Sequence, residues 1–131
     1  MDKGLYRVID ANLNRLKEGI RVIEDMARYF ENNKNLSSQL KDLRHKAKTD
    51  DIQPLLKSRD ARNDVLRPTI DSEMERSSIE SIIIANYKRA QESSRVLEEI
   101  YKVIDPVLSE NFKHIRYELY TLEKENLASS K

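Results

Sequence analysis

The chain has 131 residues, with 24 Lys and Arg against 23 Asp and Glu, two glycines, three prolines and no cysteine. The length suits one domain, and a net charge of +1 gives no reason to expect nucleic acid or a membrane as a partner. Without cysteine there is no disulfide or thiolate metal site, and two glycines are too few for a Gly-rich phosphate loop. We therefore expect a soluble, cytoplasmic, all-helical domain.

Apolar residues recur every three or four positions over residues 5–30, which predicts a long amphipathic helix. The asparagine-rich cluster 32–35 ends it, and Ser37 is the expected N-cap of a second helix that continues to residue 47. A further helical turn is expected at 50–56, around Pro54. The first part of the chain thus forms a helical hairpin with a short addition.

The second part begins after a charged segment, residues 58–72, that we interpret as a long loop. Ser77 and Glu80 have the spacing of a capping box, which predicts a third helix from there. Asp105-Pro106 is a cap followed by a proline in the first turn, so a fourth helix is expected to about residue 126. Helices of these lengths, joined by short connections, are typical of a four-helix bundle.

An internal repeat relates the two parts. Residues 11–25 read ANLNRLKEGIRVIED and residues 85–99 read ANYKRAQESSRVLEE, while LKDLRH at 40–45 resembles FKHIRY at 112–117. The sequence therefore predicts a duplicated hairpin, a long helix followed by a short one, with pseudo-twofold symmetry. The expected organisation is one domain over 1–127, with repeats 5–49 and 77–126, a linking loop 57–76 and a frayed tail 128–131.

Two repeated amides lie where apolar side chains are expected. On a helical wheel Asn12 and Asn86 fall inside the apolar stripes, and an unpartnered amide there costs about 1–3 kcal/mol. Each should therefore brace a helix terminus or bind something. Gly19 and Ser93 follow on the same faces and open space there, as a ligand cleft between the two long helices would require. Structural and ligand-binding roles both remain open.

The repeated charges divide by position on the wheel. Arg15 and Arg89 flank the stripes, and for them too a structural role and a ligand role both remain open. Glu18 and Glu92 lie further round, and the remaining repeated charges have the spacing of exposed ion-pair ladders worth a few tenths of a kcal/mol per pair. The residues assigned to these surface ladders are Arg21, Glu24, Arg95 and Glu98.

The segment from Arg59 to Arg76 is the second candidate for chemistry. Four arginines alternate there with five carboxylates. Arginine binds phosphate bidentately, and one or two carboxylates with water suffice for Mg²⁺. The segment is thus able to hold a Mg-nucleotide or a phosphorylated metabolite, although a loop of mixed charge is also typical of a merely solvated surface.

Four segments of the chain together resemble a known family. They are IDANLNRLKEGIRVIEDMARYF (9–30), LKDLRH (40–45), LLKSRDARNDV (55–65) and ERSSIESIIIANYKRAQESSRVLEEIYK (75–102). It is the small all-helical hydroxymethylpyrimidine-phosphate kinase family of thiamine biosynthesis, which is also found fused to the N-terminus of bacterial thiamine-phosphate synthase. The resemblance covers about residues 6–102. The loop departs from the family pattern RDTxxDVG at Ala61 and Leu66.

The resemblance implies transfer of the γ-phosphoryl group of ATP to 4-amino-5-hydroxymethyl-2-methylpyrimidine phosphate, with Mg²⁺. It implies catalytic roles for Arg59, Asp60, Asp64 and Arg76. It implies that the residues lining the substrate cleft are Asn12, Arg15, Glu18, Asn86, Arg89 and Glu92. Asp64 and Glu75 would hold the metal.

Two further interpretations are kept beside the kinase. The chain could be a non-catalytic helical module that binds the pyrimidine phosphate or docks on thiamine-phosphate synthase. It could also be a structural bundle whose repeated charges only fix register. A homodimer is compatible with any of the three, because the modest apolar content of 38% leaves room for extra burial between chains.

Overall fold

The computed structural model describes residues 2–49, 52–68 and 78–129. Its helices, which confirm the all-helical prediction, are α1 (Lys3–Asp25), the π-helical turn η1 (Met26–Phe30), α2 (Lys34–Lys46), α3 (Ile52–Ser58), α5 (Ile79–Tyr101) and α6 (Pro106–Ser129). The described part contains no strand and no helix apolar and long enough to cross a membrane.

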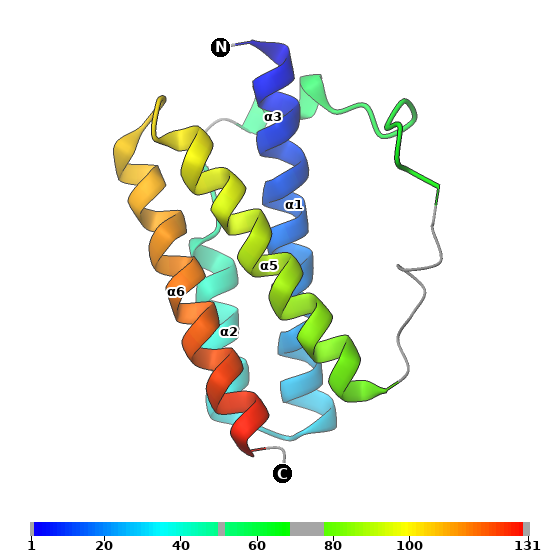
Figure 1. Cartoon of the computed structure of the whole chain (residues 1–131), viewed down its shortest axis with the longest axis vertical. Helices are drawn as coiled ribbons and strands as arrows, with labels where there is room; N and C mark the ends of the chain where they lie inside the picture. Colours follow the sequence, from blue (N-terminus) through cyan, green and yellow to red (C-terminus); the bar gives the residue numbers. More distant parts are fainter. Residues whose placement is uncertain (1, 50–51, 69–77, 130–131) are drawn as a thin grey trace.

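The helices form a bundle in which α1 and α5 run antiparallel and pack against each other (Figure 1). Each also packs on its own hairpin partner, α1 on α2 and α5 on α6, and α2 touches α6. One core joins them, built from apolar side chains of both hairpins and of α3, including Leu16, Leu40, Leu55, Leu97 and Phe112. The repeated hairpins thus bury a shared face, as the sequence predicts. In the second hairpin, however, α6 has 24 residues and is as long as α5.

The cap predicted for α2 is wrong, whereas the helix predicted to start near Ser77 does begin there, at Ile79. Asn33, and not Ser37, caps α2, because its side chain accepts from the Leu36 N–H at 3.0 Å; Ser37 lies inside the helix. The capping box of α5 is made by Ser78 and Ser81, each accepting from the other's backbone N–H. The predicted cap Ser77 lies outside the described residues. The predicted start at Asp105 is confirmed, since its carboxylate accepts from the N–H groups of the first turn of α6.

Gly19 permits close packing and does not open a cleft. A Cβ atom at this position would lie 3.1 Å from the carbonyl oxygen of Asn86 and 3.4 Å from the Cβ atom of Ala90, so α5 fills the space beside α1. Ser93, the equivalent residue of the second repeat, is buried and donates its hydroxyl to the carbonyl of Arg89. The predicted opening next to these small residues is therefore wrong.

Two of the expected surface-ladder residues are buried instead. Glu24 accepts from Arg44 at 2.7 Å, and Glu98 accepts from Arg116 at 2.9 and 3.1 Å. Both glutamate side chains are only 5% exposed. Because these pairs occupy matching positions of the two repeats, they join each long helix to its own partner in the same way. The two arginines of the expected ladders remain on the surface, where Arg21 pairs with Asp25 and Arg95 pairs with Glu99 and, at 3.5 Å, with Glu98.

The amides at the repeated positions are also used alike. Asn12 donates to the carbonyl of Val8 at 2.9 Å, and Asn86 donates to that of Ile82 at 2.8 Å. Each amide therefore finds a partner one turn back in its own helix, which neither of the two predicted roles included.

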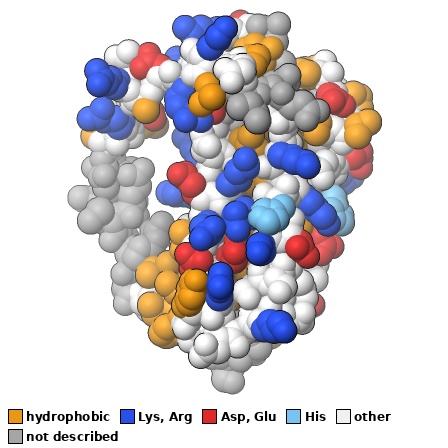
Figure 2. Space-filling model, turned by 180° about the vertical axis from the view of Figure 1, so that it is seen from behind, with side chains coloured by type: hydrophobic (Ala, Val, Ile, Leu, Met, Phe, Trp, Pro, Cys, Tyr) orange, Lys and Arg blue, Asp and Glu red, His pale blue; other side chains and the backbone are white. Residues whose placement is uncertain are grey.

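Charges of both signs are mixed on the surface that carries α2. Figure 2 shows Lys and Arg side chains over much of this face with Asp and Glu between them.

Candidate functional site

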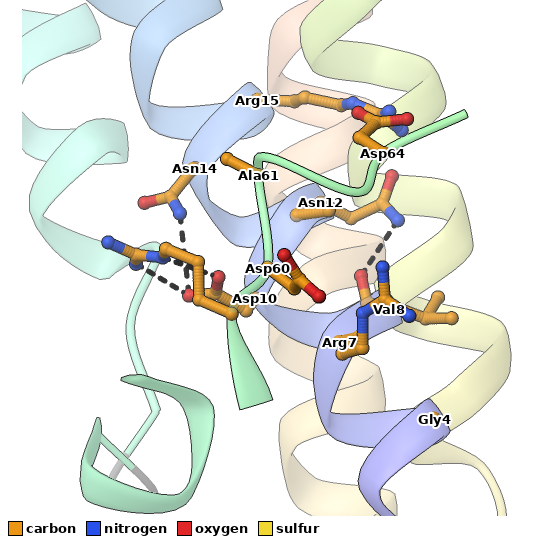
Figure 3. Close-up of a pocket in the computed structure, with 12 residues that line it drawn as sticks. Gly4, Arg7, Val8, Asp10, Asn12, Asn14, Arg15, Asp60, Ala61 and Asp64 are labelled. Carbon is orange, nitrogen blue, oxygen red and sulfur yellow. Dashed lines mark hydrogen bonds and ion pairs between the residues drawn. The ribbon is translucent and has the colours of Figure 1, made fainter. Parts of the chain in front are cut away.

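A hollow of about 530 Å³ lies between the first half of α1 and the segment that follows α3 (Figure 3). The residues that line it are Gly4, Arg7, Val8, Asp10, Ala11, Asn12, Asn14, Arg15, Arg59, Asp60, Ala61 and Asp64. We call it the α1 hollow. It contains five of the predicted site residues, and it lies beside α1 and the loop instead of between the two long helices.

A buried carboxylate fixes the central arginine of the α1 hollow. Arg59 donates from Nε to Oδ2 and from Nη2 to Oδ1 of Asp10, both at 2.7 Å. The Asp10 side chain is 9% exposed and that of Arg59 is 45% exposed, so the carboxylate is anchored in the protein while the guanidinium borders the hollow. This bond with Asp10 is also the largest cause that raises the pKa of Arg59. The arginine is a permanent, oriented cation.

Asp10 was not singled out from the sequence. In the sequence it stands next to residues of the apolar stripe of α1 and looks like an ordinary charged residue of an amphipathic helix. Its partner Arg59 lies 49 residues further along the chain. The repeat does contain a signal: the matching position of the second half, 74 residues on, is Ile84. A carboxylate at a position that is apolar in the other repeat marks a place where the symmetry is broken.

Asn12 and Arg15 line the α1 hollow from the helix side. Because the Nδ2 atom of Asn12 is bound to Val8, its Oδ1 points the other way (Figure 3). Arg15 is exposed and forms no ion pair with any residue that the structure describes. The hollow therefore offers an amide oxygen that accepts and a second guanidinium that donates.

The two aspartates of the loop shape the backbone around Arg59. Asp60 accepts from the side chain and the backbone N–H of Asn63, which together with the charges of Arg7 and Lys3 lower its pKa. Asp64 accepts from the N–H of Leu66 at 3.0 Å. Among the described residues only Asn32 has a positive φ, so the turn at Leu66 forms without the left-handed backbone that glycine would favour.

The remaining predicted residues do not meet at this place. Glu18 is exposed and does not line the α1 hollow, although its charge contributes to the raised pKa of Arg59. Asn86 and Arg89 lie on α5, and Glu92 borders a different hollow beside Tyr120. Arg76 and Glu75 lie outside the described residues.

The carboxylates near the α1 hollow suit a metal only as partial ligands. The described part of the chain contains no group of three or more His, Cys, Asp or Glu that could hold a metal by itself. Mg²⁺ commonly takes one or two carboxylates and completes its shell with water and substrate phosphates. Asp60 and Asp64 each use oxygens in loop hydrogen bonds and keep further lone pairs, so they fit that role.

Comparison with known proteins decides the family, because the ThiD2 family model matches residues 7–125. The chain belongs to the ThiD2 family. The match covers both hairpins of this ThiD2 chain and therefore includes α3 and the loop that carries Arg59. No solved structure matches the ThiD2 chain.

Among its relatives are proteins named thiamine-phosphate synthase. That of Nostoc punctiforme is 40% identical over 120 residues, which are 91% of this ThiD2 chain and 34% of that protein. That of Synechocystis sp. is 37% identical over 126 residues, 95% of this chain and 37% of that protein. The ThiD2 chain thus spans about a third of the length of these relatives.

Proposed function

We propose that the chain is a kinase of thiamine biosynthesis that transfers the γ-phosphoryl group of ATP to 4-amino-5-hydroxymethyl-2-methylpyrimidine phosphate. The observation that carries the proposal is the bidentate anchoring of Arg59 by the buried Asp10, at a hollow that Arg7 and Arg15 also line. Family membership and the names of the relatives support the pathway.

The side chains of the α1 hollow suit phosphoryl transfer. This reaction requires that two phosphate groups be positioned and that charge on the transferring oxygens be neutralised, without a covalent nucleophile. Arg59 is oriented before any ligand binds, so little conformational entropy is lost when it meets a phosphate. Asn12 presents an acceptor oxygen, which complements the exocyclic amino group of the pyrimidine.

Mg²⁺ is part of the proposal. It would neutralise the phosphates of ATP and lie near Asp60 and Asp64, with Glu75 as a further ligand. The chain's own residues would order the loop, hold the acceptor phosphate and keep Arg59 aimed at the group that is transferred.

The direct test is incubation of the chain with the pyrimidine monophosphate, Mg²⁺ and ATP, followed by assay for ADP and for the pyrimidine diphosphate. Arg59→Ala is expected to lower kcat/KM by at least 100-fold, because an oriented arginine at a transferring phosphate contributes that much or more. Arg21→Ala is the matched control, since Arg21 lies on α1 and does not line the α1 hollow. Its partner within the described ranges is Asp25, in a largely exposed pair.

The other outcomes separate the remaining interpretations. Saturable binding of the monophosphate without ADP would leave a non-catalytic module that binds the substrate or docks on thiamine-phosphate synthase. Neither turnover nor binding would leave a structural bundle. A homodimer and a separate synthase as partner are also proposals, and sedimentation of the chain alone and with the synthase tests both.

A further inference from the structure

Two more hollows continue from the α1 hollow toward the N-terminus of α1. The nearer one, about 330 Å³, shares Arg7, Arg59 and Asp60 with the α1 hollow and adds Lys3 and Ser58. The further one, about 430 Å³, shares Lys3 and Ser58 with its neighbour. The three hollows therefore follow one another along a single path beside α1.

The spacing of residues on α1 explains this path. Lys3, Arg7, Asp10 and Asn14 follow one another at intervals of three or four positions and so project from one side of the helix. Tyr6 belongs to the same side, since it lies three positions after Lys3 and four before Asp10. From Tyr6 to Asn14 this side rises about 12 Å. Because α3 packs against α1 and ends just before Arg59, it forms the opposite wall of the path.

The character of the lining changes along the path. The further hollow is bordered by the ring of Tyr6, which packs on the core, and by that of Pro54 on α3. Its polar lining residues are Lys3, Gln53, Lys57 and Ser58. The middle hollow has three cations, Lys3, Arg7 and Arg59, against the single carboxylate of Asp60. The further hollow thus offers two rings beside its lysines, and the middle hollow connects it to the anchored arginine.

We propose that this path is the nucleotide site, with the base of ATP against Tyr6 and Pro54, its phosphate chain between Lys3, Arg7 and Arg59, and the pyrimidine phosphate in the α1 hollow. The inference rests on the proposed function and assigns the phosphoryl donor to one face of α1. Aromatic rings stack on nucleobases without regard to their identity, and arginine and lysine bind phosphates. Arg59 borders both hollows and therefore stands where donor and acceptor phosphates meet.

The repeat supports a single nucleotide site per chain. α3 and the Arg59 segment follow the first hairpin, and α3 packs against α1. At the positions that match Tyr6 and Arg7, the second half has Glu80 and Ser81, which supply neither a ring nor a cation. The path thus lies where the two halves of the chain differ.

Direct binding measurements test the site without requiring turnover. Binding of ADP with Mg²⁺, of inorganic pyrophosphate and of the pyrimidine monophosphate is measured by calorimetry on the full chain. Tyr6→Ala is expected to weaken ADP about tenfold and pyrophosphate less than twofold, whereas Tyr6→Phe keeps the ring and the affinity. Arg7→Ala is expected to weaken ADP and pyrophosphate by similar factors.

Two further variants serve as controls. The first tests the site without removing a side chain that packs on the core, and the second removes a ring elsewhere on the surface. Gln53→Trp, at an exposed position of α3, fills the hollow beside Tyr6 and is expected to weaken ADP while pyrophosphate is unaffected. Tyr117→Ala removes an exposed ring from α6 and is expected to change none of the affinities.

Unchanged ADP affinity in Tyr6→Ala and Gln53→Trp would overturn the site, as would an equal loss of pyrophosphate affinity in these two variants. If ADP is formed but the KM for ATP is the same in both variants, the site is wrong and the kinase stands. If no ADP is formed but ADP binding depends on Tyr6 and on an open hollow at Gln53, the site stands and the kinase proposal fails.

Discussion

The pairing of Asp10 with Arg59 shows how one buried residue prepares an exposed one. Asp10 is held in place by α1 and by its burial. Its two hydrogen bonds of 2.7 Å therefore orient the guanidinium of Arg59 at the edge of the α1 hollow. Asn14 adds a weaker contact to the same carboxylate, at 3.4 Å. The carboxylate acts on the site through Arg59, and it contacts the loop 49 residues further along the chain.

Asp10→Asn is expected to lower kcat/KM for phosphoryl transfer about 100-fold. The amide keeps the size of the side chain but replaces one of the two acceptor oxygens that hold Arg59 with an NH₂ donor, which lets Arg59 shift. Steady-state kinetics on the purified variant check this, with thermal unfolding to show that the fold persists. Asp42→Asn, at an exposed position of α2, is the control. Equal activity of Asp10→Asn and the wild type would remove Asp10 from the positioning of Arg59.

Glu31 is a partly buried residue whose ionised carboxylate opposes folding. Among the residues that the structure describes, its Oε1 atom is buried without a hydrogen-bond partner, and burial raises the pKa of the carboxyl from its ordinary value. Because the folded state holds this proton more tightly than the unfolded state, Glu31 favours folding below the unfolded pKa and loses that contribution as the pH rises through the folded pKa.

Glu31→Gln is therefore expected to raise the free energy of unfolding by about 0.5–1 kcal/mol at pH 7 and to leave it nearly unchanged at pH 4. Urea denaturation at the two pH values measures the difference. A gain of the same size at both values would contradict a role for the ionised carboxylate.

At the scale of the elements, the contact of α1 with α5 depends on one glycine. Gly19→Ala brings a methyl group to 3.1 Å from the Asn86 carbonyl, a backbone atom of a packed helix that has little room to move. We expect a loss of about 1–2 kcal/mol in the free energy of unfolding, after the gain in helix propensity is included.

Gly4→Ala is the matched control for Gly19→Ala. The atom nearest to an added Cβ there is Oδ1 of Asp2, at 3.2 Å, and it belongs to an exposed side chain that can move aside. Denaturation midpoints of the two variants are compared. A Gly19 variant as stable as the Gly4 variant would show that the two helices are not in close contact.

The buried ion pairs of the two hairpins differ in the exposure of their arginines. We expect this difference to decide how much each pair contributes to the free energy of unfolding. Arg116 is 10% exposed and Arg44 is 20% exposed, while both glutamates are 5% exposed. Glu98→Gln leaves the more deeply buried guanidinium without its charge partner and is expected to cost about 3 kcal/mol, with a smaller loss for Glu24→Gln. Asp25→Asn, in the exposed pair with Arg21, is expected to cost less than about 0.5 kcal/mol. Urea denaturation ranks the three, and equal losses for all three would contradict the role of burial.

The sequence predicts the helices and the repeat well, because apolar periodicity and identical blocks are local properties. The sequence predicts helix starts less accurately where one segment both ends a helix and begins the next. The asparagine cluster ends the first helical region and also supplies the cap of α2, so Ser37 became a plausible but wrong choice. The π-helical turn after Asp25 leaves no mark in the spacing, and Glu24 and Glu98 follow the pattern of a surface ladder although each is buried.

The candidate site was predictable in part for the same reason. Asn12 and Arg15 stand out on the wheel of one helix, and the density of arginine and aspartate marks the loop. The helix and the loop are brought together by the contact between Asp10 and Arg59. No local sequence pattern indicates a contact between residues so far apart. The assignment of the α5 residues to the same site followed from the symmetry of the repeat, whereas α3 and the loop that form the α1 hollow occur in only one half.

At the scale of the whole molecule, the two hairpins form one cooperative unit. Buried apolar side chains of both hairpins belong to one core cluster, and α1 packs along α5. The hydroxyl of Tyr101 on α5 also lies 3.1 Å from Thr49, which follows α2, so a buried polar contact crosses between the repeats.

We therefore expect a single unfolding transition for the chain by itself, although it spans only about a third of its longer relatives. Far-UV circular dichroism reports all helices, whereas tyrosine fluorescence reports mainly on the second hairpin, because four of the six tyrosines lie on α5 and α6. If the second hairpin unfolded before the first, the fluorescence change would precede the loss of helix. Coincident urea curves from the two probes would confirm one unit, and separated midpoints would contradict it. The Gly19→Ala variant sharpens the test, since a weakened α1–α5 contact in a cooperative molecule moves both curves together by the same amount.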